Sequence, residues 1–275
     1  QMVPELFRAL KLVVDEDRLS NKPEAQGNYL LTGSANILSL PKLSDSLVGR
    51  MNVLTLYPLT TAEAKKGQGN GLDRLLRMDF IGIKNHRGLT LTEAMKLSTF
   101  PEISTWGNTE RNHWFDGYLT TMLQRDVKQF ADLEKTSVLP QLLRILATRA
   151  GGLLNDSAIA REIGMTSVTT KTYRYILQMM FLTFDIKPWH RNIGKRLVKT
   201  PKGYLADSSM LCYMLDLNID EIASHKPALF GHIVENYVAT EIVKQLSNSD
   251  SKVGLYHFRT SDGKEVDFIL EKPDG

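Results

Sequence analysis

The sequence has a single cysteine, Cys212, and no long apolar run among its 275 residues. A single cysteine excludes an internal disulfide and is consistent with a reducing compartment. Because Cys212 lies in the apolar stretch MLCYML, we expect a buried, unreactive side chain. No Cys/His spacing suggests zinc, no signal peptide opens the chain, and no stretch approaches the roughly 18 to 20 apolar residues that span a bilayer. These absences predict a cytoplasmic protein without membrane contact.

The net charge is small overall, but charge is unevenly distributed along the chain. The net charge is +3. Residues 136–203 hold eleven cations and three acids, a net charge of +8, whereas residues 206–275 hold twelve acids and six cations, a net charge of −6. Such asymmetry predicts separate modules with separate partners. With 42% hydrophobic residues, the chain can bury a sizeable core in two or three domains.

The first part of the sequence alternates helical and strand patterns. Residues 3–19 keep apolar side chains on one helical face, and residues 29–31 read as the end of a buried strand. A short capped helix over 44–50 and a second strand over 51–60 follow. This alternation predicts part of a parallel sheet with crossovers, and residues 61–135 are expected to be mostly helical.

Polar residues follow the first strand at the point where its apolar run stops. Ser34 and Asn36 come directly after Thr32-Gly33. One interpretation is a strand-to-helix turn that is capped by one of the two side chains. The other is a ligand site, because open α/β sheets bind ligands at the carboxyl ends of their strands.

The basic segment has the spacing of a helix-turn-helix followed by a wing. Three helices are expected within 139–181, and the second is capped and ends at Gly164. Gly194 and the 201–203 turn then break extended runs. Bound to DNA, the third helix would present Ser167, Thr169, Thr170, Lys171 and Arg174, and the wing would bring Arg191, Lys195, Arg196 and Lys199 to phosphates. Alternatively, the module is structural, or the acidic segment covers this face.

The acidic segment combines a helix and a hairpin. Glu235 lies in the first half of a helical stretch, and Asp267 lies on the second strand of a hairpin around Ser261-Asp262-Gly263. Glu265, near Asp267, has Lys264 or Arg259 as possible ion-pair partners. The segment is compatible with a carboxylate site or with a structural, metal-free domain.

The order of these motifs resembles a family of prokaryotic AAA-type P-loop ATPases with an uncharacterised C-terminal domain. The stretches that carry it run from VPELFRALKLVVDEDR and NYLLTGSANILSL through LLNDSAIAREIGMTSVTTKTYRYIL and PKGYLADSSMLCYML to GHIVENYVATEI and YHFRTSDGKEVDFIL. The resemblance implies an α/β, multidomain chain in four parts. These are 1–65, the C-terminal part of an ATPase domain with a partial parallel sheet; 66–135, a helical lid or linker; 136–205, a winged helix; and 206–275, a truncated PD-(D/E)XK nuclease-like α/β domain.

The same resemblance implies roles for individual residues. Ser34 and Asn36 match the sensor strand that reads the γ-phosphate, and Arg50 resembles an arginine directed at phosphate charge, with a salt bridge as the alternative. In nuclease-like folds, residues at the positions of Glu235 and Asp267 hold Mg²⁺. No G-x-x-x-x-G-K-[ST] loop occurs in the sequence, so this chain alone is predicted not to hydrolyse ATP.

The expected function is therefore that of a longer protein. We expect an ATPase that uses ATP and Mg²⁺ and acts on nucleic acid or on a protein partner, with neither cofactor bound to this fragment. The alternatives are a DNA-binding regulator switched by nucleotide and a metal-dependent nuclease gated by ATP. Duplex DNA, a protein partner or a second copy of the chain are the expected partners.

Overall fold

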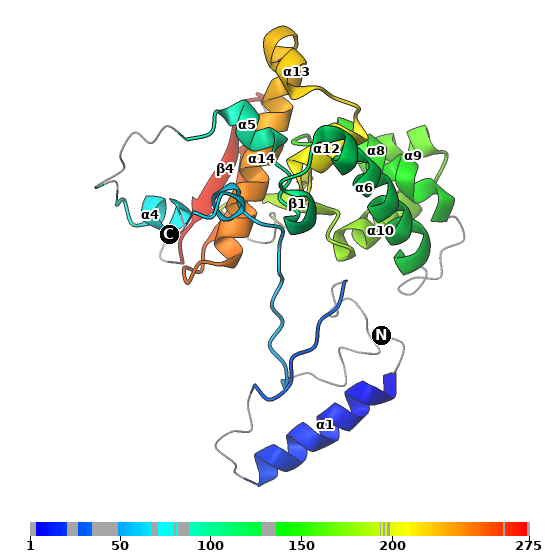
Figure 1. Ribbon diagram of the computed structural model, residues 1–275, viewed down its shortest axis with the longest axis vertical. Helices are drawn as coiled ribbons and strands as arrows, with labels where there is room; N and C mark the ends of the chain where they lie inside the picture. The colour runs from blue at the N-terminus through cyan, green and yellow to red at the C-terminus, as the bar shows by residue number, and fades with distance from the viewer. Residues whose placement is uncertain are drawn as a thin grey trace.

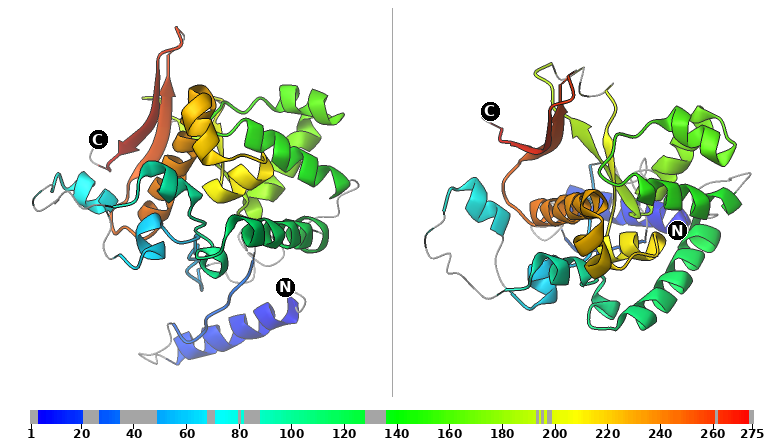
Figure 2. Two further views of the ribbon diagram at one scale, coloured as in Figure 1. Left: turned by 45° about the horizontal axis from the view of Figure 1, so that its top comes forward. Right: turned by 90° about the horizontal axis from the view of Figure 1, so that it is seen from above.

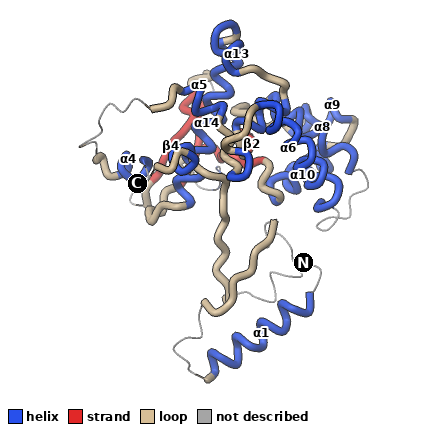
Figure 3. Tube along the Cα trace, in the orientation of Figure 1, coloured by secondary structure: helices blue, strands red, loops and turns tan. Residues whose placement is uncertain are grey.

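The computed structural model describes residues 4–20, 27–34, 49–67, 71–79, 81, 88–127, 136–192, 194, 196, 199–260 and 262–273. Helices dominate these residues, and their four strands form one sheet (Figure 3). The α-helices are α1 (Pro4–Leu19), α3 (Thr61–Ala64), α4 (Gly71–Leu76), α5 (Leu91–Lys96), α6 (Asn108–Thr121), α8 (Leu139–Thr148), α9 (Asp156–Ile163), α10 (Ser167–Met179), α12 (Ser208–Met214), α13 (Ile219–His225) and α14 (Pro227–Ser247). Shorter turns are the 3₁₀ helices η2 (Pro101–Ile103) and η4 (Thr136–Val138) and the π-helical η3 (Met122–Asp126).

The N-terminal residues lie apart from the main body. Figure 1 shows α1 below it, joined to it by an extended segment that includes residues 49–60. The predicted strands at 29–31 and 51–60 have no strand pairing in the described part of the chain, so the parallel sheet expected there is not formed by these residues. Several of their apolar side chains are consequently exposed, with Leu30 at 90%, Leu54 at 84% and Leu56 at 97%. Two isolated strands without further neighbours bury too little surface to be stable.

The three helices predicted in the basic segment are confirmed as α8, α9 and α10. Asn155 caps α9 by accepting a hydrogen bond from Ala158 N, and Gly164 ends that helix with a left-handed backbone, φ +66°. Thr166 then caps α10 by accepting from Thr169 N. Because side-chain caps satisfy the orphan amides of the first turn, these local signals fix where each helix begins.

The sheet crosses the boundary that was expected at residue 205. Its strands are β1 (Thr183–Pro188), β2 (Lys202–Leu205), β3 (Gly254–Arg259) and β4 (Glu265–Glu271), in the order β2-β1-β3-β4. The predicted hairpin is confirmed as the antiparallel β3–β4 pair, and β1 pairs antiparallel with β2 and parallel with β3. The strands expected to form a separate wing therefore belong to the same sheet as the C-terminal hairpin.

Helices cover this sheet and supply the main core. Helix α14 and the β3–β4 hairpin lie side by side (Figure 2), and Ala239 of α14 packs in one cluster with Tyr204 of β2 and Phe268 of β4. The larger core forms around α8, where Leu139, Leu142 and Leu143 are completely buried. Full burial of such side chains stabilises the fold by roughly 1.5 to 3 kcal/mol each. The core thus joins the basic segment to α12, α13 and α14.

Two expectations from composition concern this body. Cys212 is a buried free thiol, and burial first, with the charge of Asp207, raises its pKa to about 12, as expected for an unreactive side chain. No helix in the described part of the chain has the length and apolar character of a membrane-spanning segment.

Candidate functional site

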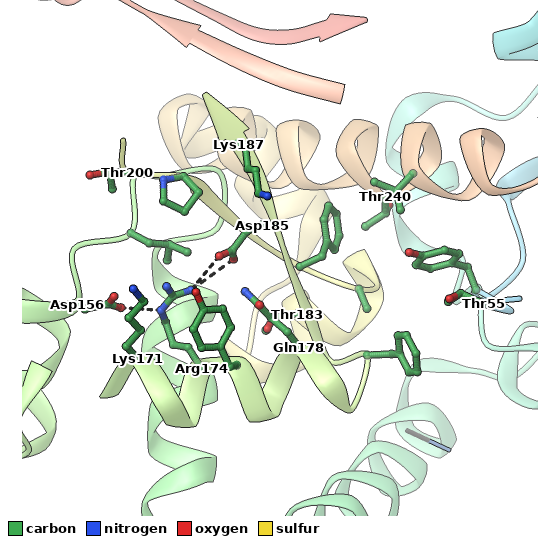
Figure 4. A pocket seen from close by; sticks show the side chains of 18 of the residues that line it. Thr55, Asp156, Lys171, Arg174, Gln178, Thr183, Asp185, Lys187, Thr200 and Thr240 are labelled. Atoms are coloured by element: carbon green, nitrogen blue, oxygen red, sulfur yellow. Dashed lines mark hydrogen bonds and ion pairs between the residues drawn. The ribbon is translucent and has the colours of Figure 1, made fainter. Parts of the chain in front are cut away.

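A basic cleft opens between α10, β1, α14 and residues 199–201. It is a cavity of about 610 Å³ whose walls also include Thr55 and Tyr57 of the extended N-terminal segment (Figure 4). The charged residues that line it are the cations Lys171, Arg174, Lys187, Arg196, Lys199 and Lys244 and the acids Asp156 and Asp185. Cations outnumber acids in this lining. The net charge of the cleft therefore depends on which of these cations are neutralised by ion pairs.

Arg174 is neutralised inside the wall of the cleft. Its Nε lies 2.6 Å from Asp156 Oδ1, and its Nη1 lies 3.1 Å from Asp185 Oδ2, as the dashed lines of Figure 4 indicate. The residue is 4% exposed, and Thr170, one turn earlier, is completely buried. Both of these predicted DNA contacts are therefore buried in this structure, because this face of α10 packs against the protein. Burial raises the pKa of Asp185, and the charge of Arg174 opposes that effect.

Two further cations of the cleft are also paired. Arg196 reaches Glu271 of β4 through two contacts, Nη1 to Oε2 at 2.5 Å and Nη2 to Oε1 at 2.8 Å. Lys244 is buried on α14, where its Nζ donates to Thr99 Oγ1 at 2.9 Å and lies 3.7 Å from Glu241 Oε1. Burial lowers the pKa of Lys244, although nearby acids oppose it. Arg196 and Lys244 are therefore both engaged in contacts within the protein.

Three lysines at the cleft are exposed and have no acidic partner among the described residues. They are Lys171 on α10, Lys187 on β1 and Lys199 before β2. Lys171 Nζ lies over the ring of Tyr175, 5.9 Å from its centroid. Of the other predicted contacts, Arg191 is exposed, Thr169 is half-buried with its hydroxyl on that of Thr166, and Lys195 lies outside the described residues. The uncompensated charge of the cleft thus comes from these three lysines.

A second site forms where β2, β4 and α14 meet. The structure brings Glu235 and Asp267 together, because Glu235 Oε1 and Asp267 Oδ1 each lie 2.8 Å from the Nζ of Lys202. Glu265 of β4 also pairs with this ammonium, and its other oxygen lies 3.6 Å from Arg259 Nη1. Lys202 is 2% exposed, whereas half of the Asp267 side chain faces solvent. We call Lys202, Glu235, Glu265 and Asp267 the carboxylate cluster.

Neighbouring residues fix the position of Glu235 in this cluster. Tyr204 donates its hydroxyl to Glu235 Oε1 at 2.8 Å. The other oxygen, Oε2, lies only 2.9 Å from where a Cβ on Gly151 would be, and Gly151 has φ +77°. Burial, together with the charge of Glu235, raises the pKa of Tyr204, so its hydroxyl stays a donor at neutral pH. The carboxylate is thus positioned from two sides.

A divalent metal ion does not fit the carboxylate cluster as it stands. Within the described residues, no group of three or more His, Cys, Asp and Glu side chains is arranged to hold a metal. The ammonium of Lys202 already contacts one oxygen of each carboxylate. Like charges repel strongly at such short distances, so the ammonium and a metal ion would compete for the same oxygens.

The structure describes two of the three nucleotide-related residues of the N-terminal part, Ser34 and Arg50. Ser34 is exposed, and Asn36 lies outside the described residues. Arg50 pairs with Asp15 of α1, Nε to Oδ1 at 2.5 Å and Nη2 to Oδ2 at 3.0 Å. This hydrogen bond raises the pKa of Arg50 and lowers that of Asp15. In this structure Arg50 forms the ion pair that was the alternative to a phosphate contact.

Sequence reasoning missed two members of these sites. Lys187 entered the prediction only as one of the cations of the basic segment. On β1 its side chain is exposed, whereas those of Ile186 and Pro188 on either side are buried. Lys202 was assigned to a turn, and nothing local indicated that it meets Glu235, 33 residues later, and Asp267, 65 residues later. A lone lysine in an apolar, buried strand is the one signal that was available.

Comparisons with known proteins match three segments of the chain. Residues 1–65 match the family model of an AAA domain, residues 89–221 match a domain of unknown function (DUF8612), and residues 230–275 match another (DUF4143). These matches support an AAA-type, ATPase-related family with uncharacterised domains. No solved structure matches the chain.

Relatives with similar sequences carry no functional name. The chain is 26% identical over 271 residues to the uncharacterized protein Rv2008c of Mycobacterium tuberculosis and equally to Mb2031c of Mycobacterium bovis, covering 98% of this chain and 54% of each relative. An uncharacterized protein of Haemophilus influenzae is 26% identical over 259 residues, which cover 90% of this chain and 57% of that protein. The chain thus spans about half the length of the curated relatives it matches.

Proposed function

We propose that this chain is the part of an AAA-type ATPase that binds nucleic acid, and that it does so through the basic cleft. The observation that carries the proposal is the set of three exposed lysines, Lys171, Lys187 and Lys199, which line one cavity without acidic partners in the described part of the chain. Phosphate backbones bind to such uncompensated charges because neutralisation releases condensed counterions.

Contacts between the AAA-matching segment and this cleft support a coupling of the two parts. Thr55 and Tyr57 line the cavity. A few residues later, Thr61 N donates to both oxygens of Glu241 on α14 at 3.1 Å, and the hydroxyls of Thr61 and Tyr237 lie 2.8 Å apart. A change in the ATPase part would therefore reach the wall of the cleft through residues 55–61.

The role of nucleotide belongs to the longer protein. The 275 residues contain no phosphate-binding loop, so no step of ATP hydrolysis is assigned to them. Arg50 remains a candidate for contact with phosphate charge in that protein, provided that it leaves Asp15. Phosphoryl transfer depends mainly on positioning and on charge stabilisation, which an arginine that approaches only at that stage can supply.

The test measures binding of a labelled duplex and of its single strand by fluorescence anisotropy at several salt concentrations. Replacing Lys171, Lys187 and Lys199 by Ala together should weaken binding and reduce the log-log salt slope by up to about three units. The matched control replaces Lys65, Lys226 and Lys252, which are also exposed but do not line the cleft. No binding at low salt, or equal losses in both triple variants, would contradict the proposal.

A regulator that is only switched by nucleotide is the second candidate. It shares the cleft, and the Thr61 contacts would serve it equally well. Measurements of ATP turnover in the longer protein distinguish the two candidates. Nucleic acid that accelerates steady ATP turnover favours an ATPase that acts on it. Nucleotide that alters nucleic-acid affinity without sustained turnover favours the regulator.

A further inference from the structure

We propose that the ammonium of Lys202 is the resident cation of the carboxylate cluster, which therefore holds β2, β4 and α14 together without a divalent metal. The proposal concerns the site at Glu235 and Asp267 and does not depend on nucleic-acid binding. It departs from the expectation that these two carboxylates hold Mg²⁺.

The three N–H donors of Lys202 match the three carboxylates of the cluster in number. A lysine ammonium has three N–H donors and no acceptor. Nζ of Lys202 meets Glu235, Glu265 and Asp267, one oxygen from each. Every donor is therefore used, and a buried charge is tolerated because it is both paired and hydrogen-bonded. Burial lowers the pKa of Lys202, but the hydrogen bonds from it to Asp267, Glu235 and Glu265 outweigh that effect and raise it, so Lys202 stays charged.

The backbone of β2 prevents Lys202 from simply moving aside. Lys202 forms a bridge with Leu153, and Gly203 pairs with the preceding loop through Gly151 N to Gly203 O at 2.9 Å and Gly203 N to Gly152 O at 3.1 Å. Leu154 packs so closely on Gly203 that a Cβ there would lie 2.7 Å from its side chain. The stem of the lysine thus starts from a fixed strand that is buried along its whole length.

The neighbouring histidine does not supply a competing charge. His257 of β3 is 2% exposed. Burial, followed by the positive charge of Lys202, lowers its pKa, and the backbone of Thr200 opposes the effect only partly. The imidazole is therefore neutral at pH 7, and Lys202 faces the three carboxylates as the cation of this site.

The cluster also has a consequence for the assembly of the chain. Glu235 comes from α14, Glu265 and Asp267 come from β4, and Lys202 comes from β2, which precedes both. One ammonium thereby ties the strand pair of the basic segment to the acidic C-terminal segment. This is the role that a bound metal would fill in a site built from the same carboxylates.

The experiment titrates MgCl₂ and MnCl₂ into the chain by isothermal titration calorimetry. The wild type should show no site that depends on Glu235. Replacing Lys202 by Met leaves three carboxylates without their cation, so Lys202→Met should gain a divalent-ion site at least about tenfold tighter than any in the wild type. Lys202→Met combined with Glu235→Gln should lose that site again.

Two calorimetric results would each overturn the proposal: a wild-type divalent site that Glu235→Gln abolishes, or a folded Lys202→Met variant that gains no site. Should Lys202→Met not fold, the comparison of wild type with Glu235→Gln decides the matter alone. Thermal unfolding of the wild type gives an independent readout, since EDTA should leave its midpoint unchanged. A midpoint that falls with EDTA and is restored by Mg²⁺ would contradict a resident ammonium.

Discussion

Arg196 forms a two-point ion pair with Glu271 of β4, with Nη1 to Oε2 at 2.5 Å and Nη2 to Oε1 at 2.8 Å. The sequence predicted Arg196 as a phosphate contact. The guanidinium also lies over Tyr256, 4.7 Å from its ring centroid. Together with Lys202 and its three carboxylates, this pair brings cations of the basic segment against acids of the C-terminal segment. Part of the opposite charge of the two segments is therefore neutralised by ion pairs within the molecule.

Removing both members of this pair should leave nucleic-acid binding nearly unchanged. Arg196→Gln combined with Glu271→Gln keeps the net charge, and the guanidinium that it removes is already neutralised. We expect affinity within about twofold of the wild type and an unaltered salt slope in anisotropy titrations, because a paired cation adds little counterion release. A slope that falls by about one unit would instead assign Arg196 to a phosphate contact.

The same pair should determine how Glu271 titrates. Hydrogen bonds from Arg196 first, and from Trp189, hold the pKa of Glu271 below its usual value. A carboxyl whose pKa is lower in the folded state contributes stability above its unfolded pKa of about 4.3, and loses it as pH falls through the folded pKa. NMR titration should therefore give a Glu271 pKa that is depressed in the wild type and moves upward in Arg196→Gln. Equal values in both proteins would contradict the pairing.

Arg174 should matter for stability more than for binding. Arg174→Met leaves Asp156 and Asp185 facing each other without their cation, and breaking a buried pair in this way typically costs about 3 kcal/mol or more. Lys171→Met, on the exposed side of the same helix, is the control and should cost under about 0.5 kcal/mol. Urea unfolding measures both free energies of unfolding. Similar losses in the two variants would show that Arg174 is not held by these acids.

Local signals explain what could be predicted from the sequence. Asn155, Gly164 and Thr166 act on amides or a backbone conformation a few residues away, so the boundaries of α9 and α10 follow from them. The hairpin of β3 and β4 is also a short-range structure. The burial of Thr170 and Arg174 could not be predicted in this way, because the direction of a helix face depends on what packs against it, here Asp156 and Asp185.

The sites depend on contacts that no local pattern contains. The parallel pairing of β1 with β3 brings Lys187 opposite Tyr256, far apart in the sequence, and thereby merges two segments that were expected to be separate. Glu235 and Asp267 were candidates by residue type, but their relation to Lys202 follows only from the folded sheet. The sequence therefore identified candidate carboxylates and cations, but not which of them form ion pairs with each other.

Gly151 offers a test of how tightly Glu235 is positioned. A Cβ at Gly151 would lie 2.9 Å from Glu235 Oε2, and its φ of +77° is a left-handed conformation. Gly164 is the matched control, since it has φ +66° but a Cβ there would meet no described atom within 4 Å beyond its local backbone and chain neighbours. Replacing either glycine by Ala should cost about 1 to 2 kcal/mol for the backbone conformation alone.

Gly151→Ala should cost more than Gly164→Ala, because the added methyl group also displaces the carboxylate that Lys202 and Tyr204 contact. Urea unfolding of the two variants, each repeated in a Glu235→Gln background, separates the two effects. A shared backbone cost stays constant in both backgrounds, whereas a cost that arises from the displaced carboxylate changes when its charge is removed. Equal losses for Gly151→Ala and Gly164→Ala in both backgrounds would mean that Glu235 can move freely, and the carboxylate cluster would then be less rigid than its contacts indicate.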